Sequence, residues 1–207
     1  MVLNFLFGDA NPTFYAAFQR AGFSAATLPV VAFGFSEDES RLFVPGDVVG
    51  HYAAWNYFQS IPRPESREFV RRFRAKYGEG RMVGDAMVAA YNGVHFWAQA
   101  AREAETADPT AVIAALDRQS RDAPDGIISI DPATRSAWRP FHVARLRPDG
   151  LQFEVVWSIP RPIRPVTFVG TRPADDWRAF QADLRKRWGG GWAGGTATPR
   201  AGSAANP

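Results

Sequence analysis

Two short loops near the start of the chain carry the polar groups best suited to hold a small ligand. The first, Gly8-Asp9-Ala10-Asn11, supplies a carboxylate and an amide, and the second, Gly34-Phe35-Ser36, supplies a hydroxyl beside an aromatic ring. A carboxylate accepts hydrogen bonds from the N–H groups of an amide, and free N–H groups at a helix N-terminus donate to its carbonyl oxygen. The loops therefore indicate binding of a small polar molecule. The alternative for Asn11 and Ser36 is a purely structural role as helix caps.

Sequence patterns that carry catalysis or cofactor binding are missing. His51, His95 and His142 lie far apart, without the spacing of a metal site, and the absence of Cys excludes thiolate ligands. There is no GxSxG turn, and Ser36 in Gly-Phe-Ser-Glu is typical of a helix cap. Neither a GxGxxG loop nor a Walker A loop follows an apolar strand. We therefore expect no catalytic residue, no metal and no cofactor, and the chain is not predicted to be an enzyme.

Charge and hydropathy argue against two further classes of protein. The chain has 24 Lys and Arg against 21 Asp and Glu, a net charge of +3. These cations are spread from Arg20 to Arg200, usually near an acidic residue, whereas a nucleic-acid-binding protein concentrates its cations on one element. No apolar run reaches the length of a membrane-spanning helix, and the first eight residues have no basic stretch typical of a signal peptide. We expect neither a nucleic-acid partner nor a transmembrane segment.

The two loops are positioned by two strand–loop–helix units. Val2–Phe7 and Leu28–Phe33 are apolar runs typical of strands buried on both faces. Asn11 is predicted to cap the helix after the first strand, and Ser36 with Glu39 forms a capping box after the second. Such repeats predict a parallel α/β sheet, in which both loops lie at the carboxyl ends of neighbouring strands.

The remainder of the chain adds helices first and short strands later. Helices are expected at 65–77, 85–105, 109–118 and 175–188, strands at 48–55, 127–130, 141–146 and 153–157, and an extended segment at 159–165. Pro148-Asp149-Gly150 predicts a hairpin turn between the last two strands. Tyr52 and Trp55, on the third strand, either wall a pocket or belong to the core.

Several segments also resemble a known family. They are Gly50–Ile61, Ala89–Ala100, Asp122–Gly126, Asp131–Thr134, Phe153–Ser158 and Pro162–Pro165. In this order they are similar to the type I periplasmic binding proteins, in the branch of ABC-transporter receptors for urea and short-chain amides. The match extends from about Val2 to Trp188. Val88 departs from the pattern, because an acidic residue often stands there in the family.

The resemblance implies an incomplete clamshell of two α/β lobes joined by crossover strands. Residues 1–188 correspond to the C-terminal part of such a receptor, so the chain is expected to be truncated at its N-terminus. Residues 1–55 are assigned to the second lobe, 63–121 to helices of the first lobe, 125–165 to crossover strands and a hairpin, and 175–188 to the terminal helix. Residues 189–207, rich in Gly, Ala and Thr, are expected to be a disordered tail.

The function implied by the resemblance is that of a periplasmic receptor. It binds urea or a short-chain amide, or alternatively a branched-chain amino acid, in the cleft between the lobes and delivers it to ABC permease subunits. The predicted ligand-binding residues are Asp9, Asn11, Phe35, Ser36, Tyr52 and Trp55. The alternative is a cytosolic amide-sensing regulator of the same fold.

Overall fold

The chain divides into two compact units in the computed structural model, Met1–Pro165 and Val166–Pro207. The structure describes residues 1–166 and 170–191. In the second unit the described residues form one helix, α6 (Ala174–Arg187), close to the helix predicted at 175–188. Most of the predicted disordered tail, from residue 192 onward, lies outside the described residues. The two candidate ligand-binding loops belong to the first unit.

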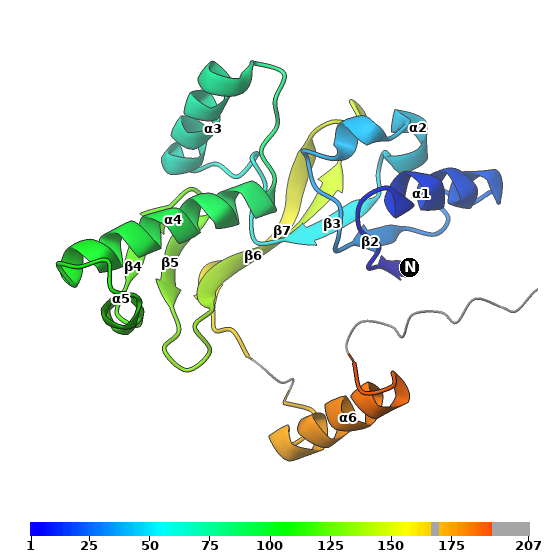
Figure 1. Cartoon of the computed structure of the whole chain (residues 1–207). Coiled ribbons are helices and arrows are strands. Elements are labelled where there is room, and N and C mark those ends of the chain that lie inside the picture. The colour runs from blue at the N-terminus through cyan, green and yellow to red at the C-terminus, as the bar shows by residue number, and fades with distance from the viewer. Residues whose placement is uncertain (167–169, 192–207) are drawn as a thin grey trace, which may run out of the picture. The chain divides into compact units, whose positions relative to one another are not determined.

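Three parallel strands carry these loops. β1 (Val2–Asn4), β2 (Val30–Ala32) and β3 (Tyr52–Trp55) lie side by side at one end of the sheet (Figure 1). Helix α1 (Ala10–Arg20) connects β1 with β2. Because β1 and β2 run in the same direction, the loops that follow them meet at one edge of the sheet. The predicted mixed α/β class with a parallel sheet is confirmed.

A long strand, β6 (Ala137–Leu146), joins the parallel strands to the rest of the unit. Its C-terminal half pairs antiparallel with β3, and its first two residues pair with β5 (Gly126–Ile130), which pairs in turn with β4 (Ser120–Ala123). The resulting strand order is β1-β2-β3-β6-β5-β4, with β7 (Phe153–Ile163) on the other side of β6. Within the described residues β7 pairs only with β6, so it is an edge strand. An edge strand tolerates proline, and β7 contains Pro160 and Pro162.

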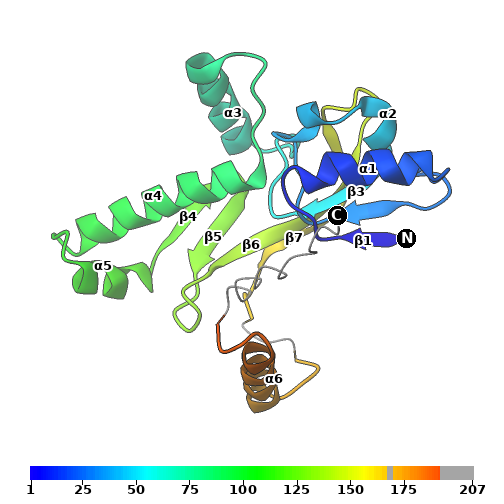
Figure 2. The same ribbon diagram turned by 45° about the vertical axis from the view of Figure 1, so that its right-hand side comes forward.

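Helices cover the two halves of this sheet differently, as Figures 1 and 2 show. α1 and the short α2 (Pro45–Val48) lie beside β1–β3, whereas α4 (Asp85–Glu103) runs along the β4–β5 hairpin and contacts α5 (Pro109–Leu116). Helix α3 (Pro64–Tyr77) precedes α4 in the chain. Buried residues on α4 recur every three or four positions, which is the pattern of a helix with one face in the core. They are Asp85, Val88, Asn92, Phe96 and Ala100.

The main core is largely aromatic and lies between β2, β3, β6 and the segments that follow them. Its fully buried large side chains are Tyr15, Phe35, Tyr57, Phe58, Leu146 and Phe153. The hairpin turn predicted at Pro148-Asp149-Gly150 is present, because the Gly150 N–H donates to the Arg147 carbonyl oxygen across 2.9 Å. Asp108 caps α5, its carboxylate accepting from the Ala111 N–H across 3.0 Å.

Two local predictions are corrected by the structure. The capping box at Ser36 was predicted to start a helix, but Ser36–Glu39 forms turns that lead into the 3-10 helix η1 (Ser40–Leu42). One half of the box is present, since the Ser36 N–H donates to Glu39 Oε2 across 3.3 Å. The Ser36 hydroxyl instead donates to Asp38 Oδ1 across 2.5 Å and so does not cap a helix. The strand predicted at 48–55 is shortened because Pro45 starts the helical turn α2.

Candidate functional site

The loops that follow β1 and β2 touch each other. The Phe33 N–H donates to the Asn4 carbonyl oxygen across 2.9 Å, which extends the pairing of the two strands. At Gly34 an added Cβ would overlap the carbonyl oxygen of Leu6, so only glycine permits this approach of the two backbones. The structure therefore brings together the two loops whose polar residues suggested ligand binding.

Asn11 fastens the two loops rather than capping α1. Its amide donates to the Leu6 carbonyl across 2.9 Å and to the Gly34 carbonyl across 3.1 Å, and its Oδ1 accepts from Asn4 Nδ2 across 2.9 Å. The N-cap position of α1 is occupied by Asp9, whose side chain makes no capping bond, so the predicted cap at Asn11 is wrong. Asn11 is buried, and both hydrogens of its side-chain amide are donated within the protein, so Asn11 positions the two loops. Its contact with a solute stays a prediction.

We expect Asn11→Ala to lower the free energy of unfolding by about 2–4 kcal/mol, because three hydrogen bonds are lost, two of them buried. A denaturant titration followed by tryptophan fluorescence measures the change. The matched control is Thr13→Ala, since the Thr13 hydroxyl is exposed and bonds only the Asp9 carbonyl at 3.5 Å. Equal destabilisation by both substitutions would contradict the positioning role.

Phe35 points into the core. Its ring is 1% exposed and packs against Phe43, with ring centroids 4.3 Å apart, and against Phe153 at 5.4 Å. Other aromatic residues of the core cover the Phe35 ring, so its position does not match the prediction that this ring forms the wall of a pocket. The backbone of Phe35 contributes differently, since its carbonyl oxygen accepts from Trp55 Nε1 across 2.8 Å.

The two aromatic residues predicted on the third strand lie at its opposite ends. Trp55 is the last residue of β3, at the same edge as the two loops, and its bond to Phe35 holds the second loop to this strand. Tyr52 is the first residue of β3 and lies opposite Val31 and Arg145, at the other edge of the sheet. The structure brings Trp55 together with the loops but leaves Tyr52 apart from them, because parallel strands place only their carboxyl ends at this edge.

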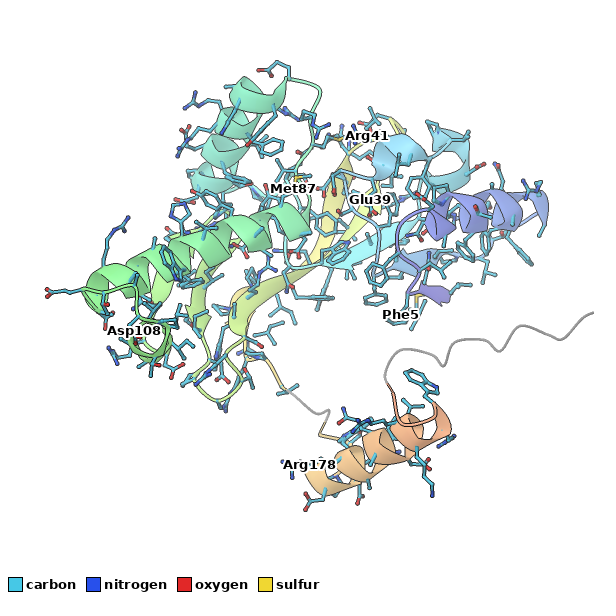
Figure 3. The ribbon with its side chains drawn as sticks, viewed as in Figure 1. Phe5, Glu39, Arg41, Met87, Asp108 and Arg178 are labelled. Atoms are coloured by element: carbon cyan, nitrogen blue, oxygen red, sulfur yellow. The ribbon has the colours of Figure 1, made fainter. Side chains whose placement is uncertain are left out.

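A small cavity of about 60 Å³ lies where the second loop approaches the start of α4. Gly84, directly before α4, packs so closely against Ser36 and Asp38 that an added Cβ would overlap both side chains. The cavity is lined by Asp38, Arg41, Gly80, Arg81, Met82 and Met87. Figure 3 shows Arg41, Glu39 and Met87 in this region. The lining of this cavity combines a carboxylate, which accepts hydrogen bonds, with guanidinium groups, which donate them.

Asp9 lies on an exposed and otherwise apolar surface. It follows three residues with large exposed side chains, Phe5 at 63%, Leu6 at 39% and Phe7 at 65%. The Phe5 ring stacks on Phe33, with centroids 4.6 Å apart, which orders this part of the first loop (Figure 3). Asp9 is exposed, and its contact with a ligand stays a prediction.

The family is decided by a match over most of the chain. The family model described as periplasmic binding protein domain matches residues 1–174. The chain belongs to this family. No helix among residues 1–166 and 170–191 of this periplasmic binding protein domain is long and apolar enough to cross a membrane.

Solved structures agree with the fold of this periplasmic binding protein domain. A solute-binding protein of an ABC transporter from Rhodopseudomonas palustris, in complex with 3,4-dihydroxybenzoic acid, is 22% identical with a TM-score of 0.68. The match covers 79% of this chain and 46% of that protein. An ABC transporter substrate-binding protein from Sphaerobacter thermophilus is 26% identical with a TM-score of 0.66, over 77% of this chain and 44% of that protein. The chain thus spans less than half the length of these relatives.

One curated relative carries the name of an enzyme. Limonene hydroxylase from Geobacillus stearothermophilus is 30% identical over 114 residues, which is 55% of this chain but 21% of that protein. Because the match covers only about a fifth of that protein, the activity in its name is not assigned to this periplasmic binding protein domain.

This periplasmic binding protein domain also holds a buried ion network that the sequence analysis did not identify. Arg139 on β6 donates from Nη2 to Asp85 Oδ1 across 2.7 Å and from Nε to Asp125 Oδ2 across 2.7 Å. Asn92 Nδ2 donates to the other oxygen of Asp125 across 2.9 Å. Burial raises the pKa of Asp85, although the Arg139 guanidinium opposes the shift. The network ties the start of α4, next to the small cavity, to β6 and the β4–β5 turn.

A further buried carboxyl group lies within the loop after β2. Glu37 is fully buried; its Oε1 accepts from the Gln59 N–H across 2.8 Å, and its Oε2 has no hydrogen-bond partner among the described residues. Burial raises the pKa of Glu37 from 4.5 to about 8. The group is therefore mostly protonated at neutral pH, next to the residues that line the small cavity. In the sequence Glu37 stands in the acidic run Glu37-Asp38-Glu39, and nothing there distinguishes it from Asp38.

Proposed function

We propose that this chain forms part of a periplasmic solute-binding receptor of an ABC importer, and that its solute is urea or a short-chain amide. The observation that supports this solute is the cavity of about 60 Å³ between the second loop and α4. The wall of that cavity includes Asp38, Arg41 and Arg81. An amide offers N–H donors and a carbonyl acceptor on neighbouring atoms, which suits a carboxylate beside guanidinium groups.

The size of the cavity favours a solute of a few heavy atoms. A benzene ring occupies a cavity of roughly 150 Å³, whereas this cavity measures about 60 Å³. The Asp38 carboxylate accepts one bond from Ser36 and retains further acceptor capacity for solute N–H groups. Asp9, exposed on the loop after β1 and outside the lining of this cavity, is the second carboxylate proposed to accept from the solute.

Larger solutes are the main competitors of this proposal. One solved relative is in complex with 3,4-dihydroxybenzoic acid, and another, from Thermotoga maritima, is a leucine-binding protein that is 18% identical. Both solutes carry a carboxylate, which the carboxylates of Asp9 and Asp38 would repel. Leucine also carries an ammonium group that these carboxylates would attract, so it is the stronger of the two competitors.

The proposed mechanism is closure of two lobes over the solute, followed by recognition of the closed form by permease subunits in the periplasm. Residues 1–55 are proposed to belong to the second lobe, residues 63–121 to helices of the first, and residues 125–165 to the crossover strands and hairpin. Trp55, at the end of β3, lies directly before the segment that leads out of the parallel strands into α3.

We expect Asp9→Ala to weaken binding of urea or acetamide by about tenfold to a hundredfold, because hydrogen bonds to a charged acceptor are worth roughly 1.5–3 kcal/mol. Isothermal titration calorimetry of the full chain with urea, acetamide, leucine and 3,4-dihydroxybenzoate measures the effect. The melting temperature is expected to stay unchanged, since Asp9 is exposed and makes no capping bond.

The matched control is Asp176→Ala, which removes an exposed carboxylate from α6 in the second unit. Unchanged amide affinity in Asp9→Ala removes Asp9 from the site. Binding of leucine or the dihydroxybenzoate, without binding of either amide, overturns the proposed solute while leaving the receptor family intact.

A further inference from the structure

A groove of about 350 Å³ lies between α3 and the first half of α4. Four aromatic side chains, a methionine and two cations line it. The methionine is Met87, labelled in Figure 3, which also lines the small cavity. No residue predicted to bind the solute lines the groove, so its chemistry has to be judged separately from that of the two loops.

The aromatic side chains form a continuous row. Phe69, Phe73 and Tyr77 follow one another at intervals of four residues, which places them on one face of α3. Their ring centroids lie 6.3 Å and 4.8 Å apart along the helix, and Phe69 lies 4.6 Å from Tyr91 of α4. Tyr77 is 55% exposed, so solvent reaches this end of the row. A flat aromatic molecule can pack against such rings.

Two cations on the same face of α3 alternate with these rings. Arg72 and Lys76 are exposed, and their side chains have no ion pair or hydrogen bond within the part of the chain that the structure describes. Lys76 Nζ lies over the Tyr77 ring, 5.3 Å from its centroid. The preceding acidic residue, Glu68, uses both oxygens to accept from Arg71. Like charges four residues apart on a helix repel each other, and an anion bound between them would relieve that repulsion.

The α4 side of the groove is positively charged as well. The Arg121 guanidinium lies over the Tyr91 ring, 5.4 Å from its centroid, and the His95 ring lies 4.3 Å from Tyr91. Burial lowers the pKa of His95, and the positive charges of three arginines lower it further. These arginines are Arg121, Arg102 and Arg72. The groove therefore lies in a positive local field.

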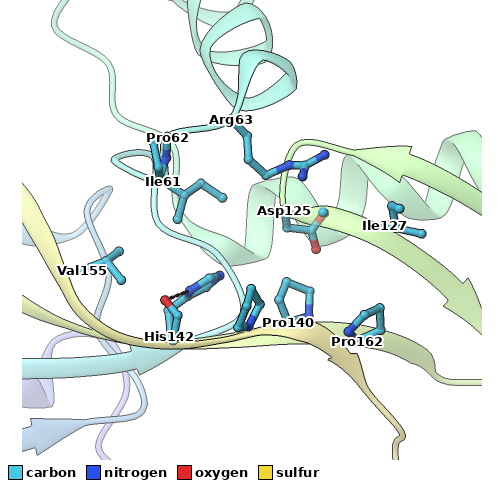
Figure 4. A pocket seen from close by; sticks show the side chains of 12 residues that line it. Ile61, Pro62, Arg63, Asp125, Ile127, Pro140, His142, Val155 and Pro162 are labelled. Atoms are coloured by element: carbon cyan, nitrogen blue, oxygen red, sulfur yellow. Dashed lines mark hydrogen bonds between the residues drawn. The ribbon is translucent and has the colours of Figure 1, made fainter.

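Another cavity, of about 390 Å³, has a different charge balance (Figure 4). There Arg63 forms ion pairs with two carboxylates, and Asp125 accepts from Arg139 across 2.7 Å. Its charged groups are therefore already compensated within the protein, whereas the two cations of the groove are not. Charge complementarity thus favours an anion in the groove between α3 and α4.

We propose that this groove binds an aromatic carboxylate, with its ring against the aromatic row and its carboxylate bonded to Arg72 and Lys76. Guanidinium and ammonium groups donate to carboxylate oxygens in charge-assisted hydrogen bonds, which are stronger than neutral ones. Two fused rings fit the volume of about 350 Å³, since a cavity of roughly 150 Å³ already holds benzene. The ligand would contact α3 and α4 at once. This binding site is additional to the amide site and does not depend on it.

Binding of 2-naphthoate, compared with uncharged 2-naphthol and non-aromatic cyclohexanecarboxylate, tests the proposal on the full chain. Calorimetry is expected to show 2-naphthoate binding at least about tenfold more tightly than either comparator. Combining Arg72→Gln with Lys76→Gln is expected to reduce 2-naphthoate affinity by at least about tenfold. Arg71→Gln is the matched control, because Arg71 is exposed on the same helix and lies outside the groove lining.

A second variant tests the aromatic row independently of the cations. Tyr77→Leu keeps an apolar side chain but removes an exposed ring, and it is expected to reduce 2-naphthoate affinity by at least about threefold. Three results would overturn the proposal: no binding of 2-naphthoate, equal binding of 2-naphthol by the unaltered protein, or 2-naphthoate affinity that the double variant leaves unchanged. Titrations with urea and acetamide are expected to be the same in all of these variants, so failure of the amide site would be seen separately.

Discussion

Arg139→Met is expected to lower the free energy of unfolding by about 3–5 kcal/mol, because it leaves two buried carboxylates without their counter-charge. The Asp85 and Asp125 side chains are 9% and 0% exposed, and Arg139 itself is 14% exposed. Methionine keeps much of the side-chain length, so the loss comes from charge and hydrogen bonding rather than from packing. Denaturant titration by circular dichroism measures the change.

Two further variants make this expectation specific to the buried network. Arg118→Met breaks an exposed ion pair with Glu103 and is expected to cost at most about 1 kcal/mol. Combining Arg139→Met with Asp85→Asn and Asp125→Asn is expected to recover part of the stability, because the uncompensated charges are removed. A triple variant less stable than Arg139→Met alone would argue against charge as the cause.

Raising the pH from 5 to 9 is expected to destabilise the protein through Glu37. The folded-state pKa of Glu37 is about 8 against an ordinary 4.5, so the folded state holds this proton more tightly than the unfolded state. Its contribution to stability is complete below pH 4.5 and is lost as the pH rises through 8. Each pH unit between the two pKa values changes the free energy of unfolding by roughly 1.4 kcal/mol.

Glu37→Gln tests this pH dependence, since glutamine has a similar shape and cannot ionise. The variant is expected to match the unaltered protein at pH 5 within about 1 kcal/mol and to be the more stable of the two at pH 9. Melting temperatures measured across this range provide the comparison. Glu68→Gln, at an exposed residue paired with Arg71, serves as the control, and its pH profile should follow that of the unaltered protein. Parallel profiles for the unaltered protein and Glu37→Gln would show that Glu37 is already ionised when buried.

The ion network and Glu37 both bear on the small cavity. Asp85 directly follows Gly84, which packs on Ser36 and Asp38, so Arg139 anchors one wall of that cavity through α4. Glu37 lies between Ser36 and Asp38 and holds the same loop to Gln59 from inside the protein. Arg139→Met is therefore expected to weaken amide binding as well as stability, whereas Asp9→Ala affects binding alone.

Local features of the sequence predicted the parallel strands and the turn at Pro148-Asp149-Gly150 correctly, because each depends on residues within a few positions of one another. The helix caps expected at Asn11 and Ser36 are wrong, and the first apolar run is largely exposed instead of buried on both faces. Strand–loop–helix order then requires the two loops to meet at one edge of the sheet. For this reason the sequence places Asp9 at that edge.

Tertiary structure alone decided which side chains face the protein interior at that edge. Phe35 turns into an aromatic core built partly from Phe153, and the Ser36 hydroxyl bonds Asp38 instead of capping a helix. Arg139 and Asp85 are 54 residues apart, and nothing within either neighbourhood of the sequence pairs them. Such contacts depend on how strands register and helices pack, which sequence periodicity does not specify. Sequence patterns thus place the two loops, whereas packing decides which of their polar groups remain free to contact a ligand.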